Sequence, residues 1–115
     1  MKERFNVELL EEAVEFLNRL EEKAREKVYY NIKKSQFVND NELFKKLNEQ
    51  IWEFRTLYKT KAYRLFSFWD NTSDQKTIVL ATHGIVKKSQ KTPQKEIKKA
   101  EEIRKQYFTN KNKKL

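Results

Sequence analysis

The sequence predicts a single α+β domain over residues 1–115, in which a small antiparallel sheet packs against an N-terminal helical hairpin and is followed by a C-terminal helix. Three patterns predict this fold. The start of the chain has apolar residues at helical spacing. The middle has three runs rich in aromatic and β-branched residues, separated by polar turns. The end returns to helical spacing, and the length suits one domain with a modest core.

Two amphipathic helices are expected first. One runs from about Glu8 to Leu20 and has an apolar arc opposite an acidic one. The other covers roughly residues 22–36, and a weak strand signal at Phe5-Asn6-Val7 precedes both. Together the helices predict a hairpin that covers one face of a sheet.

A short third helix is expected after residue 38. Asn39 and Glu42 have the spacing of a capping box, in which each end of the first turn satisfies a backbone donor of the other. The buried side of this helix would consist of Leu43, Phe44 and Leu47.

Three strands are expected next, at residues 51–58, 62–69 and 77–82, because aromatic and β-branched residues dominate these runs. Lys59-Thr60-Lys61 is a plausible hairpin turn between the first two runs. A polar cluster at residues 70–74 separates the second from the third. Consecutive strands of this kind predict an antiparallel meander.

The stretch from Ile78 to Pro93 holds the only histidine, the only glycine and the only proline of the chain. It predicts a strand that ends at His83-Gly84, then a basic loop, then a helix that starts at Thr92-Pro93. Threonine suits the N-cap and proline the first helical position, since proline lacks the backbone donor that would be unpaired there. The buried face of this helix would consist of Ile97, Ala100, Ile103, Tyr107 and Phe108.

The net charge of +9 is unevenly distributed. Residues 1–82 contain 15 Lys/Arg and 14 Asp/Glu, whereas residues 83–115 contain 11 Lys/Arg and 3 Glu. Such concentrated positive charge favours a polyanionic partner, although Lys111 to Lys114 also fit a simple solvated tail. We expect no cofactor and no metal, because the chain has no cysteine and one histidine. The absence of a long apolar run or a secretory signal predicts a cytoplasmic protein without membrane contact.

Cationic residues of the meander form the candidate site. Arg55 and Arg64 lie within aromatic runs, where a charge is costly unless it is paired or lies on an open face. The meander would bring both to one surface with His83, Lys87 and Lys88. Arginine and lysine stabilise phosphate charge, and histidine exchanges protons near neutral pH. This set suits metal-free cleavage of RNA by its own 2′-hydroxyl. Two structural alternatives stay open: Glu53 pairs with an arginine, and His83 is a structural histidine.

Three segments resemble the HigB toxins of the RelE/ParE superfamily, most closely the phage-associated HigB-like branch. They are Trp52-Glu53-Phe54-Arg55, Tyr63-Arg64-Leu65-Phe66 and the run from Ile78 to Pro93. The resemblance covers about residues 52–100 and implies a compact RelE-like α+β fold with a small twisted sheet. It also implies a toxin that cuts mRNA in the ribosomal A site. A helix-turn-helix antitoxin of the HigA type would silence it.

The resemblance also implies roles for single residues. Arg55 and Arg64 match the strand cations that grip phosphate, and His83, Lys87 and Lys88 match the cationic strand end and loop near the scissile bond. The expected RNA contacts are Lys59, Lys61, Lys91 and Lys95. No C-terminal catalytic tyrosine is evident, because Tyr107 fits the buried stripe of its helix. His83 is therefore the expected proton carrier.

The leading hypothesis is a ribosome-dependent mRNA endonuclease whose partners are the ribosome, mRNA and the antitoxin, with operator DNA bound only through the antitoxin. One alternative is a ParE-type toxin that inhibits DNA gyrase without cutting RNA. Another is a small RNA-binding protein without catalytic activity.

Overall fold

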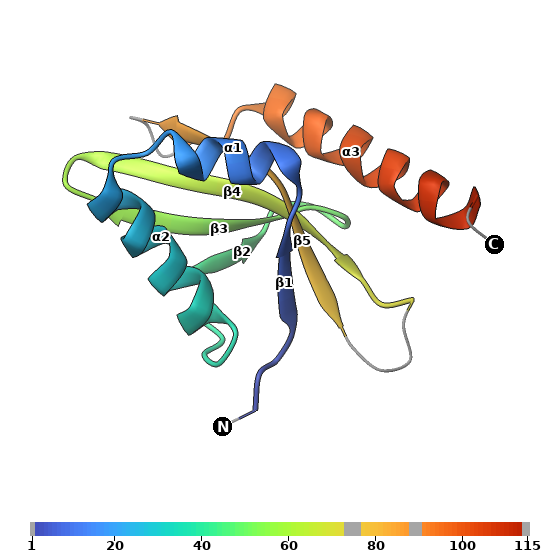
Figure 1. Ribbon diagram of the computed structural model, residues 1–115, viewed down its shortest axis with the longest axis horizontal. Coiled ribbons are helices and arrows are strands. Elements are labelled where there is room, and N and C mark those ends of the chain that lie inside the picture. The colour runs from blue at the N-terminus through green and yellow to red at the C-terminus, as the bar shows by residue number, and fades with distance from the viewer. Residues whose placement is uncertain (1, 73–76, 88–90, 114–115) are drawn as a thin grey trace.

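The computed structural model describes residues 2–72, 77–87 and 91–113, and within these ranges three helices surround a five-stranded twisted sheet (Figure 1). The strands are β1 (Asn6–Leu9), β2 (Phe44–Lys46), β3 (Trp52–Tyr58), β4 (Lys61–Asp70) and β5 (Ile78–Lys87). The helices are α1 (Glu11–Asn18), α2 (Glu22–Ser35) and α3 (Gln94–Lys113). The predicted α+β class is confirmed.

The predicted meander forms the centre of the sheet. β3, β4 and β5 are consecutive antiparallel neighbours, and the sheet is extended on both sides in the order β1-β5-β4-β3-β2. β2 pairs antiparallel with β3, whereas β1 pairs parallel with β5. The weak strand signal near the N-terminus thus corresponds to a real edge strand, which makes the sheet mixed.

The two faces of the sheet are covered differently. α1 and α2 cover the face that carries Phe54, Leu65 and Val79, here called the hairpin face (Figure 1). α3 covers part of the other face, which carries Phe66 and Leu80 and is here called the α3 face. Side chains alternate along a strand, so each strand contributes to both cores.

The prediction of a short helix after residue 38 is wrong. Asp40, not Asn39, accepts the local side-chain hydrogen bond, from the backbone N–H of Glu42 at 2.9 Å, and this Asx turn leads into β2. Phe44 then pairs with Phe54 across the ladder, with ring centroids 4.4 Å apart. Pairing to the edge of β3 and aromatic stacking outweigh the local capping signal.

The predicted strand end at His83-Gly84 is also wrong, because β5 continues to Lys87. Gly84 has no positive φ and pairs with Leu65. A Cβ built on Gly84 would lie 2.3 Å from Cδ2 of Phe16 in α1. The only glycine therefore permits close packing of helix on strand instead of forming a turn.

A β-bulge in β5 changes which side chains face which way. Phe66 pairs with His83 and Ser67 pairs with Ala81, so Thr82 is the extra residue. Such an insertion shifts the alternation of the strand by one residue. After it, His83 and Lys87 lie on the α3 face, while Gly84 lies against α1.

α3 begins at Gln94, slightly later than expected, and the carbonyl of Pro93 accepts hydrogen bonds from the backbone N–H groups of Glu96 and Ile97. Its far half is held by Asp70, a buried carboxylate that accepts hydrogen bonds from the hydroxyl of Tyr107 at 2.7 Å and from Nζ of Lys111 at 2.6 Å. No helix in the described ranges combines the length and apolar character needed to cross a bilayer.

Candidate active site

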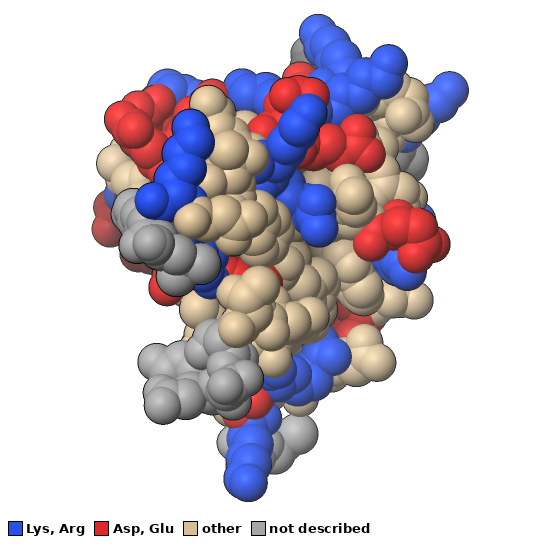
Figure 2. Space-filling model, turned by 90° about the vertical axis from the view of Figure 1, so that its right-hand side faces the viewer, with Lys and Arg blue, Asp and Glu red and all other residues tan. Residues whose placement is uncertain are grey.

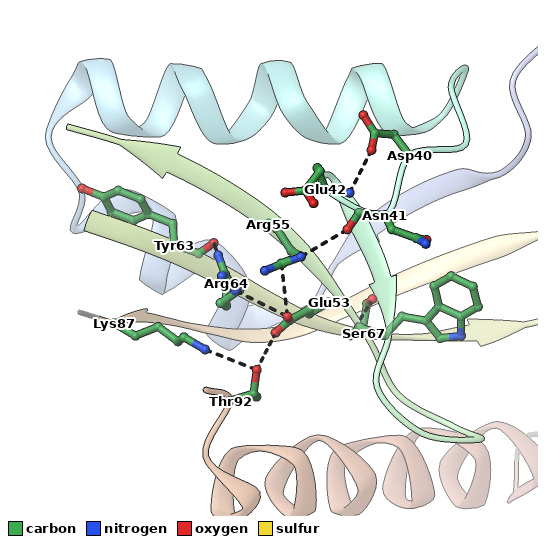
Figure 3. Close-up of polar contacts among 11 residues, drawn as sticks. Asp40, Asn41, Glu42, Glu53, Arg55, Tyr63, Arg64, Ser67, Lys87 and Thr92 are labelled. Carbon is green, nitrogen blue, oxygen red and sulfur yellow. Dashed lines mark hydrogen bonds and ion pairs between the residues drawn. The ribbon is translucent and has the colours of Figure 1, made fainter. Parts of the chain in front are cut away.

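The centre of the candidate site is a pair of arginines on neighbouring strands. Arg55 and Arg64 are direct cross-strand partners, and like charges in this position destabilise a sheet unless they are compensated. Glu53 supplies the compensation, because its Oε1 lies 3.5 Å from Nε of Arg55 and 3.4 Å from Nε of Arg64 (Figure 3). The alternative that Glu53 pairs with the arginines is thus confirmed, for both of them.

Burial differs within this cluster. The Arg64 side chain is 1% exposed and that of Arg55 is 17% exposed. Neither Nε has a neighbour in hydrogen-bond geometry in the described part of the chain, although both are ion-paired to Glu53. Arg64 has donated one hydrogen bond to the carbonyl of Tyr63 and keeps further donors. The guanidinium groups therefore retain capacity for an anion.

Thr92 connects Lys87 to this cluster. Nζ of Lys87 donates to the Thr92 hydroxyl at 3.3 Å, and that hydroxyl donates to Oε2 of Glu53 at 3.3 Å (Figure 3). Thr92 precedes α3, so the start of this helix is tied to β3 and β5. The threonine that the sequence assigns to a helix cap serves the site instead.

The arginines open onto a small hollow of about 100 Å³, which is lined by Glu42, Arg55, Leu57 and Arg64. Pockets for drug-sized ligands measure roughly 300–1,000 Å³, so this volume suits a small polar group. Leu57 is 62% exposed beside the two cations. The hollow thus combines two cationic side chains with one carboxylate and one apolar side chain that is open to solvent.

Positive charge exceeds negative charge in the cluster, since two arginines and one lysine share the Glu53 carboxylate. Burial lowers the pKa of Arg64, and Glu53 opposes that shift. Burial also lowers the pKa of Lys87, repulsion from Arg64 lowers it further, and Glu53 again opposes the change. An anion in the hollow would relieve this repulsion.

His83 shares the α3 face with the arginines but is enclosed. Its ring stacks on Phe66 with centroids 4.9 Å apart and is 4% exposed. Its Nδ1 lies 2.9 Å from the hydroxyl of Thr82, and its Nε2 lies 3.1 Å from Oε1 of Glu96 in α3. Burial lowers the pKa of His83, and the hydrogen bond to Glu96 opposes that shift. Its role as proton carrier stays a prediction.

The remaining expected site residues lie around this centre or beyond the described chain. Lys88 lies outside the described residues. Lys91 and Lys95 are exposed near the start of α3, and Lys59 and Lys61 are exposed at the β3–β4 turn. On the side of the molecule drawn in Figure 2, cationic side chains stand in separate groups between acidic and uncharged surface. The net charge of the chain therefore does not locate the site, whereas the cluster around Arg55 and Arg64 does.

Three site residues were not expected from the sequence. Thr92 was assigned to a helix cap, and Glu42 to a capping box. Glu96 carried no assignment, and its contact with His83 depends on the packing of α3 against β5. Among the described residues, no group of three or more His, Cys, Asp or Glu side chains could hold a metal ion.

Comparison with known families gives one clear match. The family model described as "Phage derived protein Gp49-like (DUF891)" matches residues 15–105, more than half of the chain. The chain belongs to the Gp49-like family. This family is associated with toxins of the RelE superfamily, and the matched range contains β2 to β5 and every site residue named above. Neither the comparison with curated proteins nor that with solved structures found a match.

Proposed function

We propose that this Gp49-like protein is the toxin of a toxin–antitoxin system and acts as a ribosome-dependent mRNA endonuclease of the HigB type. The observation that carries the proposal is the cross-strand pair Arg55–Arg64, which shares one carboxylate and lines a hollow open to solvent. A fold gains nothing from placing two arginines opposite each other in a sheet. Groups with a perturbed pKa, such as the buried Arg64, are common at functional sites.

In this proposal the scissile phosphate binds in the hollow beside Arg55 and Arg64. Arginine donors can bind two phosphate oxygens at once. They also stabilise the extra negative charge of the phosphorane, and this type of stabilisation is usually the largest contribution to catalysis. In many other nucleases a metal ion stabilises this negative charge. Because the arginines supply that stabilisation here, the proposed reaction needs no divalent metal.

The proposed reaction is attack by the 2′-hydroxyl of the RNA. The 2′-oxygen forms a bond to phosphorus while the bond to the 5′-oxygen breaks, which leaves a 2′,3′-cyclic phosphate and a 5′-hydroxyl. We propose that Lys87, in place of the enclosed His83, accepts the proton of the 2′-hydroxyl. This proposal is supported by Thr92, which holds the Lys87 amine beside Glu53 and the arginines. A water molecule protonates the 5′-oxygen, and the hydroxide that remains takes the proton from Lys87, which restores the neutral amine. The lowered pKa of Lys87 raises the fraction of neutral amine at a given pH.

The decisive experiment measures cleavage of a defined mRNA on purified ribosomes. We expect Arg64→Ala to slow cleavage by at least about 100-fold, the usual cost of losing one transition-state donor. Arg64→Met is a second variant that keeps the buried volume. Lys105→Ala, an exposed change on the far side of α3, should cut at the wild-type rate. Circular dichroism and thermal unfolding would show that each variant is folded.

Lys87 is tested by changing its proton affinity and keeping its charge. Lys87→Arg retains a cation for phosphate but holds its proton too tightly to act as a base. We therefore expect slow cleavage with unchanged ribosome binding, and a rate that no longer rises with pH as in the wild type.

Two outcomes would contradict the proposal. Full activity of both Arg64 variants would rule out the proposed site. DNA breaks in cells whose mRNA stays intact would instead favour a toxin that inhibits DNA gyrase.

The partners follow from the same proposal. The ribosome presents the mRNA in its A site, and a helix-turn-helix antitoxin of the HigA type neutralises the toxin in the cytoplasm. Operator DNA is contacted through the antitoxin. Co-expression of the neighbouring reading frame should restore growth to cells that produce the wild-type protein.

A further inference from the structure

A second hollow, of about 300 Å³, lies at the β3–β4 turn on the hairpin face. This turn reaches the connection between α1 and α2 at the left of Figure 1. Among the residues that line the hollow are Arg19, Tyr58, Lys59, Lys61, Tyr63 and Val86. It differs from the arginine hollow, which opens on the opposite face of the same two strands.

Two tyrosines give this hollow an aromatic lining with free polar groups. Tyr63 is 6% exposed and Tyr58 is half-buried. In the described ranges of the chain, neither phenol hydroxyl has a hydrogen-bond partner. Neither hydroxyl is among the enclosed, unpartnered polar atoms of the described residues, so both are open to solvent. Val86 adds apolar surface and is 44% exposed.

The rim of the hollow is cationic. Arg19, Lys59 and Lys61 are all exposed there. The one carboxylate on the rim is Glu21, which lies 3.7 Å from Nζ of Lys59 in a solvent-exposed pair. Exposed pairs of this kind are weak, so an anion competes for Lys59 at little cost. The hollow therefore offers the half-buried ring of Tyr58 and excess positive charge in one place.

Its position connects it to the proposed active site. Tyr63 and Arg64 are adjacent in β4 and point to opposite faces, as do Val86 and Lys87 in β5. Both hollows are lined by residues of β3 and β4, and the turn that joins these strands carries the exposed Lys59 and Lys61.

We propose that the hollow at the β3–β4 turn is a second RNA-binding site that takes one nucleotide, with its base on the ring of Tyr58 and its phosphate on the cationic rim. The inference rests on the proposed function and extends it to a contact away from the cleaved bond. Bases stack on aromatic side chains irrespective of sequence, so this site adds affinity without adding codon preference.

The experiment measures fluorescence anisotropy of a labelled 12-nucleotide RNA whose 2′-O-methyl groups prevent cleavage. We expect Arg19→Glu/Lys61→Glu to weaken binding by at least tenfold. The matched control is Lys98→Glu/Lys105→Glu, which makes the same charge change on α3 and should weaken binding much less. Tyr58→Phe should bind like the wild type, and Tyr58→Leu, which keeps apolar bulk, should lose roughly 5- to 100-fold.

The nucleotide could belong to mRNA or to ribosomal RNA, and two further measurements separate these sources. If it belongs to ribosomal RNA, Arg19→Glu/Lys61→Glu weakens binding to ribosomes that carry no mRNA. If it belongs to mRNA, binding to empty ribosomes is unchanged and the variant loses affinity only for programmed ribosomes. Either result supports an RNA site.

Equal RNA affinity of both double variants would overturn the inference, as would equal binding by Tyr58→Leu and Tyr58→Phe. Loss of antitoxin binding with unchanged RNA affinity would also overturn it, because the hollow would then be a protein-docking surface. Since the RNA cannot be cleaved, these outcomes do not depend on catalysis. If the wild-type protein bound the RNA but did not cleave mRNA on ribosomes, the proposed function would be wrong and the RNA site would still stand.

Discussion

Replacing Gly84 with alanine tests whether the only glycine of the chain serves packing. The added Cβ would lie 2.3, 2.6 and 2.7 Å from three ring atoms of Phe16. The last of these atoms is Cγ, at the root of the ring, so rotation of the ring alone does not clear the contact. Phe16 is itself buried against the sheet, and either the ring or α1 has to move.

The expected cost is at the upper end for an overpacked core, about 3 kcal/mol of the free energy of unfolding. That is a large part of the roughly 5–15 kcal/mol that stabilises a typical domain. At about 4 °C per kcal/mol for a chain of this size, the melting temperature should fall by about 12 °C. Urea unfolding monitored by tryptophan fluorescence gives the free energy directly.

A double-mutant cycle identifies the cause. Phe16→Leu removes the ring atoms that the new Cβ meets, so Gly84→Ala should cost at least about 1 kcal/mol less in that background. Ile85→Val is the matched control, because its side chain lies on the opposite face and should not couple to Phe16→Leu. An unchanged melting temperature for Gly84→Ala, or equal costs in both backgrounds, would refute this account of Gly84.

Two further predictions concern pH. Hydrogen bonds from Lys111, Thr72 and Tyr107 outweigh burial and hold the pKa of Asp70 well below its usual value of 3.8; the stability that this gives is present at neutral pH and is lost as pH falls below about 4. Asp70→Asn should therefore be less stable at pH 7. Its free energy of unfolding in urea should also fall less steeply than that of the wild type between pH 5 and 2. Burial lowers the pKa of His83 from 6.5, so the unfolded state binds the proton more readily and the wild type should lose stability as pH falls below about 6.5. His83→Gln should remove that slope between pH 7.5 and 5, and an unchanged slope would show that His83 does not titrate as its burial implies.

Much of the fold could be predicted because it depends on local patterns. The amphipathic stripes of α1, α2 and α3 and the aromatic runs of β3 and β4 each bury one face of their own element. The segment around Phe44 could not be predicted in this way. Its capping signal is local, whereas its strand conformation depends on pairing with Phe54 and on stacking against rings distant in sequence.

The candidate site was predictable in part for the same reason. Arg55 and Arg64 are identifiable because charge is unusual within aromatic strands, and the turn between these strands sets their register. Thr92 and Glu96 contact the site only because α3 folds back over the sheet. No pattern within residues 91–96 shows this, since the partners Glu53 and His83 belong to other elements.

The sequence by itself determined the three helices, the three strands of the meander and the presence of unusual cations, because propensity and hydrophobic periodicity act over a few neighbouring residues. Only the tertiary structure decided which cations meet. Simple alternation from Val79 and Ala81 would turn Lys87 toward the helical hairpin. The extra residue Thr82 reverses the alternation and directs Lys87 to the arginines. A bulge depends on how two strands pair, so the sequence of either strand alone does not predict it.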